Sequence, residues 1–526
     1  MSIVIEELGI TENDIQLPIF PPEQPIPSPI PTPTIVTWDG PSDPHDPFNW
    51  SPRKKWLVIT LSLLASFISS MNGTILSVAH NSINSEFHIS DSHFPNSYWP
   101  IASWGVGDAI FSLVLFPVME DFGIRPVFLG TYLLFVASLI PIGFARNFET
   151  LVVVRFFSGG CVQLLSNAVA GVILNVWRDD RERSVPISLY VTTYLVSTSM
   201  GPVIGAAILK YLDWRWIGHI ELIWTVAFFP LFIFCLPESR GSAILIAKAK
   251  QLRKEGKETY TAEEFHKQPI HRILIKSVQR PLYMLLTESV VFIATLWAAF
   301  SLGTIYLFTQ SVEQVYSQLY NWNSLQAGYV QLAIAIGECV GCLLCMYTNS
   351  WYYDSASRNT EVPGTPIPEA RLYPSVIGGF LGVTGGIFLY GWTSLSSLHW
   401  LVPTIGLFLV GFGTSAIIIS NANYLVDAYS KYAASALGAV GLVENIALAF
   451  IPLASEKMYT DLRFQWASSL LGFVSLGLVA TPFAVFRWGK VIRGRSPFMK
   501  EAVLEKRGLM AGDEGVVLGY IVPMKP

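Results

Sequence analysis

Residues 56–76 read WLVITLSLLASFISSMNGTIL, which is 21 residues without a charged side chain. The stretch follows directly on the basic run Arg53, Lys54 and Lys55. A bilayer has a hydrocarbon core about 30 Å thick, and roughly 20 apolar residues in a helix cross it. These residues therefore predict a membrane-spanning helix with a basic flank on its N-terminal side.

The same kind of stretch recurs along the chain. We place the twelve spans at 56–76, 98–118, 126–144, 151–176, 186–209, 216–236, 282–308, 327–347, 374–392, 401–421, 433–454 and 467–487. Backbone that crosses lipid must satisfy its hydrogen bonds internally, so apolar spans of this length are helices. The polar segment 237–281 divides them six and six. The sequence predicts an all-α integral membrane protein of two six-helix bundles.

Composition agrees with a lipid environment. Only 14% of the 526 residues are charged, whereas soluble domains have about 25%. The chain has 40 Gly and 33 Pro, residues that are more frequent in membrane helices than in soluble ones. A net charge of −4 gives no indication of a nucleic-acid partner. We expect the protein to be surrounded by the lipid bilayer and to bind no nucleic acid.

The regions outside the two bundles are polar or rich in proline. We divide the chain into a Pro-rich disordered tail (1–55), a first bundle (56–236), a central loop (237–281), a second bundle (282–487) and a C-terminal tail (488–526). On this map most of the 34 Lys and Arg fall on the side that carries both termini. Since cytoplasmic loops are enriched in Lys and Arg, we expect both termini to be cytoplasmic.

Three of the five cysteines form a C-x2-C-x2-C run at Cys339, Cys342 and Cys345. The run lies inside the apolar segment LAIAIGECVGCLLCM with no histidine nearby, so we interpret it as helix packing and predict no metal site. The sequence has no phosphate-binding glycine loop with Lys-Ser/Thr and no zinc helix motif. We therefore expect no cofactor and no enzymatic activity, and an electrochemical gradient rather than ATP as the energy source.

Several motifs resemble a known family. They are DPFNWSPRKKW (46–56), PVMEDFGIRP (117–126), RFFSGG (155–160), MGPVIGAA (200–207), WRW (214–216) with LPESRGSAIL (236–245), RPLYMLLTES (280–289) and NANYLVDAY (421–429). In this order, residues 45–495 resemble the major facilitator superfamily, within it the fungal twelve-span drug:proton antiporters. The resemblance implies that family's helix arrangement and alternating-access transport.

The implied function is proton-coupled efflux of small organic molecules, such as drugs, toxins or fungal secondary metabolites. The implied partners are the organic substrate and protons. We expect a monomer in the cell membrane. Movement of polyamines or nutrients is the alternative within transport, and a membrane sensor that has lost transport is a more distant one.

The resemblance also implies gating residues in two places. After the second span, Glu120, Gly123 and Arg125 match the family's acidic-x-x-Gly-basic loop, although Ile124 stands where a first Arg is usual. In the fifth span, Gly201, Pro202 and Gly205 match its Gly-Pro-x-x-Gly motif. Proline removes a helix hydrogen bond and glycine lets a neighbouring helix approach, so this motif predicts a kink.

Ionisable residues within spans are the candidates for proton coupling, because burying one costs about 2.5–3.5 kcal/mol on insertion scales. We assign this role to Arg155, Asp108 and Glu288. For Asp108 an ion pair with Arg155 or a structural hydrogen bond are alternatives, and Arg155 itself could extend to water at the interface. Glu338 and Glu444 are further candidates, with hydrogen bonding between helices as their alternative role.

Polar and aromatic residues on a few spans would line a central cavity. The substrate-binding candidates are Asn72, Gln163, Asn167, Tyr190, Tyr194, Trp297, Phe300, Asn421 and Tyr424. A largely apolar cavity with a few such groups suits an amphipathic organic molecule. Helix packing is the alternative role for each of them.

Overall fold

The structure is a computed structural model that describes residues 34–90, 96–265, 270–360 and 362–502, without the side chains of 113–121, 265, 270 and 271. The chain forms two compact units. The larger one joins Trp38–Ile244 with Gln268–Pro526 and contains the helical bundle. The smaller one joins Met1–Thr37 with Leu245–Lys267.

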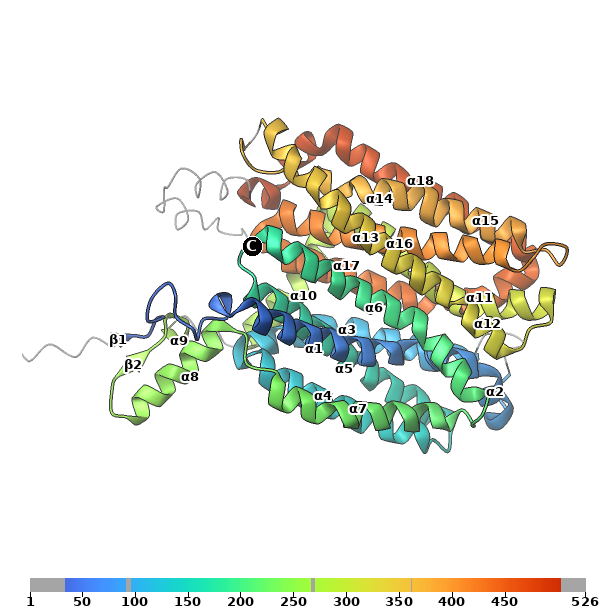
Figure 1. Ribbon diagram of the computed structural model, residues 1–526, viewed down its shortest axis with the longest axis horizontal. Coiled ribbons are helices and arrows are strands. Elements are labelled where there is room, and N and C mark those ends of the chain that lie inside the picture. Colours follow the sequence, from blue (N-terminus) through green and yellow to red (C-terminus); the bar gives the residue numbers. More distant parts are fainter. Residues whose placement is uncertain (1–33, 91–95, 266–269, 361, 503–526) are drawn as a thin grey trace, which may run out of the picture. The chain divides into compact units, whose positions relative to one another are not determined.

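The first half of the bundle has six long helices, coloured blue to green in Figure 1. They are α1 (Pro52–Ser70), α3 (Trp99–Phe122), α4 (Ile124–Gly143), α5 (Phe148–Val176), α6 (Asp180–Leu209) and α7 (Arg215–Cys235). Short helical turns precede and follow α1, namely η2 (Pro47–Asn49), η3 (Met71–Gly73), η4 (Ser77–Ala79), α2 (His80–Phe87) and η5 (Asn96–Tyr98). The first six spans are thus confirmed as helices.

The second half also has six spans, several of them interrupted. Its helices are α10 (Ile270–Thr287), α11 (Ser289–Tyr320), α12 (Ser324–Val330), α13 (Leu332–Asp354), α14 (Tyr373–Ile377), η8 (Gly378–Thr384), α15 (Gly385–Thr393), α16 (Leu401–Tyr429), α17 (Ala433–Phe450) and α18 (Ser455–Arg495). The short turns η6 (Ser355–Arg358), η7 (Pro368–Leu372), η9 (Ser430–Tyr432) and η10 (Pro452–Ala454) connect them. The all-α membrane fold with twelve spans is confirmed.

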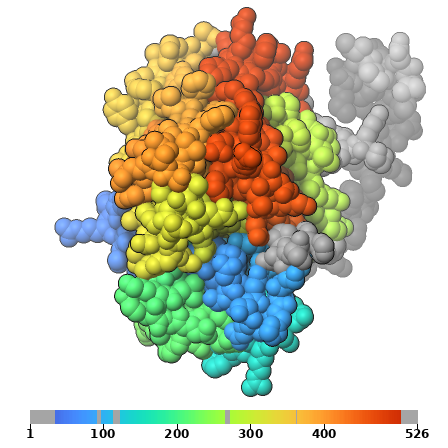
Figure 2. Space-filling model, turned by 90° about the vertical axis from the view of Figure 1, so that its right-hand side faces the viewer, coloured from blue at the N-terminus to red at the C-terminus, as the bar shows by residue number. Residues whose placement is uncertain are grey.

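Helices of this structure can also be tested for the length and apolar composition that crossing a membrane requires. Within the described residues, nine continuous ranges are long and apolar enough to cross a bilayer, and one of them, Leu401–Arg495, contains α16, α17 and α18. We call the end of the bundle where α1 begins and α18 ends the near end. The far end is the one that carries α2, at the right of Figure 1 and facing the viewer in Figure 2.

Helices in each half approach until their backbones touch, which small residues permit. A Cβ on Gly107 of α3 would lie 1.9 Å from the Phe156 carbonyl oxygen of α5. In the second half, a Cβ on Gly337 of α13 would lie 2.0 Å from the Phe408 carbonyl oxygen of α16. Membrane helices associate by such close packing, because lipid gives no hydrophobic drive between them.

Two of the three cysteines of α13 take part in this packing, whereas Cys339 is exposed. Cys342 Sγ lies 3.7 Å from the Ser188 carbonyl oxygen of α6, and Cys345 Sγ lies 3.9 Å from the Ala416 carbonyl oxygen of α16. In the described residues, no group of three His, Cys, Asp or Glu side chains is placed to hold a metal ion. The structure supports the helix-packing interpretation of the cysteine run.

The smaller unit contains a two-stranded parallel sheet of β1 (Thr34–Ile35) and β2 (Thr259–Tyr260), with Thr34 opposite Thr259. Most of α8 (Gly241–Lys254) and all of α9 (Ala262–Phe265) belong to it. Residues 1–33 of the expected disordered tail lie outside the described residues. The pairing of the segment after them with the central loop is a feature that the proline pattern did not indicate.

The two halves of the bundle meet mainly where α3 packs against α17 and where α6 packs against α12 and α13. Smaller contacts also join α3 to α10 and α6 to α16. At the far end, a Cβ on Gly328 of α12 would lie 2.6 Å from Ala206 Cβ of α6, and Figure 2 shows the yellow segment of α12 against the green end of α6. Residues that bear on transport between the halves should lie along these contacts.

Candidate functional site

Arg155 is fully buried in α5 and binds only uncharged oxygens. The helix begins after Asn147, whose side chain accepts a hydrogen bond from the Thr150 amide at 3.0 Å, so Arg155 stands two turns inside it. Its Nη1 donates to the Asn72 carbonyl (2.6 Å) and to Asn72 Oδ1 (2.8 Å), and its Nη2 donates to the Gly73 carbonyl (2.8 Å). Its Nε donates to the Pro100 carbonyl at 3.2 Å. At 0% exposure, Arg155 does not extend to water.

Two of the carbonyls that Arg155 binds, those of Asn72 and Gly73, belong to the part of the first span where the helix is broken. After α1 ends at Ser70, the chain continues as the turns η3 and η4. The Ser77 amide donates to the Thr74 carbonyl rather than to that of Gly73. Buried carbonyls without helical partners must find other donors, and the guanidinium of Arg155 supplies them.

Asn72 links Arg155 to an acidic residue that the sequence analysis did not identify. Its Nδ2 donates to both carboxylate oxygens of Glu221, at 3.2 and 3.0 Å. Its Oδ1 also accepts from Trp104 Nε1 at 3.0 Å. Glu221 lies in α7 and is 1% exposed. All the polar atoms of the Asn72 side chain thus have protein partners, so its expected contact with substrate would require this cluster to rearrange.

Asp108 lies on α3 where that helix meets α17 of the other half. Asn445 Nδ2 of α17 donates to Asp108 Oδ1 at 2.7 Å. Asp108 is 0% exposed, and within the described residues its Oδ2 has no hydrogen-bond partner. Glu444, the neighbour of Asn445, is near enough to Asp108 for their charges to interact. Within the described residues, Asp108 thus accepts a hydrogen bond from Asn445 and lies near Glu444, and its hydrogen-bond partner is not Arg155.

Glu338 occupies the corresponding position at the other contact between the halves. It lies on α13, and one oxygen accepts from the Ser199 hydroxyl of α6 at 2.9 Å. The residue is 0% exposed, and its Oε2 has no hydrogen-bond partner in the described part of the chain. Two buried carboxylates, each with one unpaired oxygen, therefore lie on the two surfaces where the halves meet.

The Gly-Pro segment of α6 packs against the broken part of the first span. Pro202 has no N–H to donate to the Thr198 carbonyl four residues earlier. The Thr74 hydroxyl donates to that carbonyl instead, at 2.6 Å. A Cβ on Gly201 would lie 2.1 Å from Thr74 Oγ1, and one on Gly205 would lie 2.3 Å from the Ile75 carbonyl oxygen. The motif thus lets α6 approach the broken part of the first span closely. It also exchanges one backbone hydrogen bond within α6 for a hydrogen bond from the Thr74 hydroxyl.

The loop after α3 is held by another acidic residue that was not identified from sequence. Gly123 has φ +88, and the amides of Ile124 and Arg125 donate to Glu238 at 3.2 and 3.0 Å. Arg125 Nη2 donates to the Ile233 carbonyl at 2.9 Å. The side chain of Glu120 lies outside the described residues. Gly123 and Arg125 are therefore tied to the segment that follows α7.

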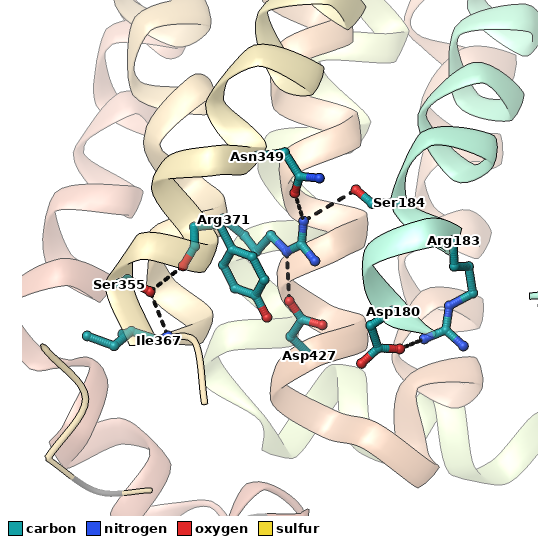
Figure 3. Close-up of polar contacts among 9 residues, drawn as sticks. Asp180, Arg183, Ser184, Asn349, Ser355, Ile367, Arg371 and Asp427 are labelled. Atoms are coloured by element: carbon teal, nitrogen blue, oxygen red, sulfur yellow. Dashed lines mark hydrogen bonds and ion pairs between the residues drawn. The ribbon is translucent and has the colours of Figure 1, made fainter. Parts of the chain in front are cut away.

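The second half has a polar cluster of its own at the near end (Figure 3). Arg371 Nε donates to Asp427 Oδ2 at 2.8 Å, and its Nη1 donates to Asn349 Oδ1 at 2.5 Å. Its guanidinium lies 3.6 Å from the centre of the Tyr352 ring. The same Nη1 lies 3.4 Å from the Ser184 hydroxyl of α6, so the cluster reaches the other half. None of these residues was a candidate from sequence.

The candidates on α11 and α16 lie mostly inside the second half. Trp297 is 1% exposed within an apolar cluster that also contains Val479, and Phe300 packs against that cluster. Tyr424 lies in a further apolar cluster. Asn421 donates to the Ala294 carbonyl at 3.3 Å. In this arrangement their contacts are with their own bundle.

Glu288 is the residue directly before α11, its side chain makes no capping hydrogen bond to that helix, and it is 5% exposed. The Tyr429 hydroxyl of α16 donates to its Oε2 at 3.0 Å. Glu288 therefore joins α11 to α16 within the second half. Unlike Asp108 and Glu338, it makes this contact inside one half and not between the halves.

Four candidates of the first half remain partly accessible. Gln163 and Asn167 on α5, and Tyr190 and Tyr194 on α6, are half-buried. Both tyrosines are near enough to Asp108 for an electrostatic interaction. The substrate-binding role of these four residues stays a prediction.

The comparisons with known proteins identify the family. Residues 62–452 match the family model of the Major Facilitator Superfamily. The chain is 32% identical over 471 residues to the MFS transporter cpaT of Aspergillus oryzae, covering 88% of this chain and 92% of that protein. It is 31% identical over the same shares to the citrinin biosynthesis cluster MFS transporter mrr1 of Monascus ruber.

A further relative is named as an efflux pump, and a solved structure shares the fold. The efflux pump atB of Aspergillus terreus is 30% identical over 88% of this chain and 90% of its own length. The crystal structure of the human organic anion transporter MFSD10 (TETRAN) aligns with a TM-score of 0.55 at 16% identity, over 82% of this chain and all of that chain. The protein is a multi-pass membrane transporter, not an enzyme, and it belongs to the major facilitator superfamily, among relatives of the fungal efflux type.

Proposed function

We propose that the protein exports small organic molecules in exchange for protons, by alternating access between its two halves. Its membership of a transporter family supports transport itself. The names of its relatives, which include an efflux pump and a transporter of a biosynthesis cluster, support export of drugs, toxins or secondary metabolites.

The observation that carries proton coupling is the pair of carboxylates between the halves. Asp108 and Glu338 are both fully buried, and in each of them one oxygen lacks a hydrogen-bond partner among the described residues. A charged carboxylate is costly to bury without full pairing. Each group would therefore favour taking up a proton when enclosed and releasing it when water enters. Arg155 and Glu288 belong to the same proposal as further charged groups of the membrane interior.

Alternating access would separate the two contact surfaces in turn. The contact of α6 with α12 and α13 runs from Ala206 and Gly328 at the far end, through Ser199 and Glu338, to the Ser188–Cys342 contact. Opening at one end would admit water to Glu338 from that side only. In this scheme the Gly-Pro segment of α6 and the loop at Gly123 and Arg125 act as gates at opposite ends.

The remaining parts of the proposal concern cellular context. We place the protein in the cell membrane as a monomer with both termini in the cytoplasm, which the distribution of Lys and Arg along the sequence supports. The near end of the bundle would then face the cytoplasm.

The test is transport by the purified protein in liposomes with an imposed pH gradient. Secondary metabolites and drugs would be screened for movement that the gradient drives and a protonophore stops. The Asp108→Asn and Glu338→Gln variants should lose gradient-driven accumulation, while Glu456→Gln, which changes an exposed carboxylate of α18, should not. Transport that continues unchanged after the gradient is collapsed would show that proton coupling is wrong.

Polyamine transport is the second candidate, and the buried carboxylates favour it because they could pair with a cationic substrate. The same liposomes distinguish the two functions. Saturable movement of spermidine, with no movement of neutral organic compounds, would replace the efflux proposal by this one.

A further inference from the structure

Glu221 is a buried carboxylate that neither the sequence motifs nor the proposed function uses. It lies on α7 at 1% exposure. Both of its oxygens accept from one neutral donor, Nδ2 of Asn72. Its own carbonyl accepts from the Thr225 hydroxyl at 2.6 Å, which fixes the backbone and leaves the carboxylate dependent on Asn72.

The positively charged group nearest in function to Glu221 is Arg155, and the Asn72 side chain lies between the two, bonded to both. Arg155 is close enough for its charge to act on Glu221, but its donors are directed to oxygens of Asn72, Gly73 and Pro100. Two tyrosine hydroxyls also lie in this region: Tyr132 of α4 donates to the Thr225 carbonyl at 3.0 Å, and Tyr306 of α11 interacts with Arg155. His219, two residues before Glu221 on α7, packs against the Phe144 ring, with ring centres 5.0 Å apart.

We propose that Glu221 binds and releases a transported proton, and that Asn72 is the positioning residue that reports its protonation to the broken first span. The inference deepens the proposed function and rests on its proton coupling. The carboxylate takes one proton from water to form a carboxylic acid, and one O–H bond is made. On release the same bond breaks and the proton returns to water, so the cluster gains and loses one positive charge in each cycle.

Residues 72–74 connect Glu221 to the Gly-Pro segment of α6. Hydrogen bonds to a charged group are about twice as strong as those between neutral groups, so protonation weakens the hold of Glu221 on Asn72. Asn72 and Gly73 are adjacent to Thr74, whose hydroxyl binds the Thr198 carbonyl of α6. A shift of residues 72–74 therefore reaches the Gly-Pro segment directly.

A purely structural role for Glu221 makes a different prediction. Hydrogen bonding between helices would need only an acceptor for Asn72. Glutamine supplies a carbonyl oxygen at almost the same place but cannot take up a proton at this pH range. Glu221→Gln therefore separates the two roles, and Glu149→Gln, at an exposed position in the first turn of α5, is the matched control.

The first measurement compares two modes of transport in liposomes. Exchange of labelled for unlabelled substrate needs no net proton movement, whereas accumulation driven by a pH gradient does. Glu221→Gln should keep exchange at the wild-type level and reduce gradient-driven accumulation to that of liposomes without a gradient. Glu149→Gln should keep both. Wild-type accumulation by Glu221→Gln would overturn the inference, and so would loss of both modes, since that indicates a structural role.

The second measurement counts protons and does not depend on transport. A pH dye records proton uptake by the purified protein on acidification. Glu221→Gln should take up about one proton fewer than wild type, and Asn72→Ala should keep that proton but take it up at a different pH. Equal uptake by wild type and Glu221→Gln would refute the inference. Glu221→Gln could take up one proton fewer while transport by the wild-type protein does not depend on the pH gradient. That pair of results would refute the proposed proton coupling but keep Glu221 as a proton-binding site.

Discussion

Thr74 and Pro202 show how a single side chain can compensate for a missing backbone hydrogen bond. Proline leaves the carbonyl four residues earlier without its helical donor. Here that carbonyl belongs to Thr198, and Thr74 donates to it from another span at 2.6 Å. The Thr198 carbonyl of α6 is thus paired through a contact between helices, and the stability of this contact should depend on one hydroxyl.

Replacement of Thr74 tests this directly. Thr74→Val keeps the shape but leaves the Thr198 carbonyl buried without a donor, which should cost about 1–3 kcal/mol. Thr74→Ser keeps the hydroxyl and should remain close to wild type. Thermal unfolding of the purified protein in detergent measures both. Equal unfolding temperatures for wild type and Thr74→Val would mean that the contact contributes nothing.

Gly201 is needed for the same close approach. A Cβ there would lie 2.1 Å from Thr74 Oγ1 and 2.9 Å from the Ile75 amide nitrogen, so Gly201→Ala should lower the yield of folded protein and the unfolding temperature. Gly477→Ala in α18 meets nothing within 4 Å and should raise stability by about 0.5–1 kcal/mol. A Gly201→Ala protein as stable as Gly477→Ala would contradict the packing described.

The sequence was informative for residues whose chemistry is unusual inside lipid. Arg155 and Asp108 were recognised in this way, whereas Gly201 and Pro202 were recognised through the family motif, and the structure places all four at helix contacts. Glu221 was missed because it lies close to the predicted start of its span, where an acidic residue normally faces water. Its burial depends on Asn72, which is 149 positions away in the chain, and no local pattern carries that information.

At the scale of elements, the cluster around Arg371 joins the turn η7 to α13 and α16. Arg371 and Asp427 are 7% and 8% exposed, so each compensates the other's buried charge. Glu369 of the same turn forms an ion pair with Arg493 of α18. These contacts fix the connection between α13 and α14 at the near end.

Removing one partner of the buried pair should be more harmful than removing both. Arg371→Met leaves Asp427 without its arginine and should destabilise the protein by about 3–5 kcal/mol. The double variant Arg371→Met with Asp427→Leu should recover most of that loss. Unfolding temperatures of the single and double variants decide the matter, and additive losses would show that the two residues do not interact.

The smaller unit should respond to acid. Arg253 forms an ion pair with Glu264 at 2.8 Å, and its hydrogen bond lowers the pKa of Glu264 from 4.5 to about 2. A lowered folded-state pKa stabilises the unit above the unfolded value and loses that effect as the pH falls from about 4.5 towards 2. The protection factors for amide hydrogen exchange in residues 249–264, which are corrected for the intrinsic pH dependence of exchange, should therefore fall over this interval.

The matched variant for that experiment is Glu264→Gln, in which the ion pair is already absent. Its amides in residues 249–264 should be less protected than those of wild type near neutral pH. Their protection factors should also change less than those of wild type on acidification. If wild type and Glu264→Gln showed the same dependence on pH, the Arg253–Glu264 pair would not stabilise this unit.

Helices were easier to predict than the breaks within them. All twelve spans have the predicted order, because roughly 20 apolar residues suffice to identify each one. The turns at Met71–Gly73, the π-helical segment Gly378–Thr384 and the left-handed Arg463 (φ 60) inside α18 were not predicted. These irregularities are stabilised by neighbouring helices, as Arg155 stabilises the first of them, so they are properties of packing rather than of local sequence.

At the scale of the whole bundle, the two halves repeat one packing solution. In the first, α3 and α5 touch through glycine, and in the second α13 and α16 do the same. The contacts of α3 with α17 and of α6 with α13 cross between the halves. They carry Asp108 and Glu338, and one carboxylate oxygen of each has no hydrogen-bond partner in the described residues. Family resemblance predicted the two halves, whereas the partners of these carboxylates required the structure.

The central claim is that these crossing contacts open at one end while they close at the other. Distances between paired spin labels test it most directly. In a cysteine-free background, one pair would be placed at the far end, on Tyr211 and Tyr329, and another at the near end, on Arg181 and Tyr353. On changing pH or adding substrate, one distance should lengthen while the other shortens. If both distances stayed fixed, or lengthened together, the alternating-access account would be contradicted.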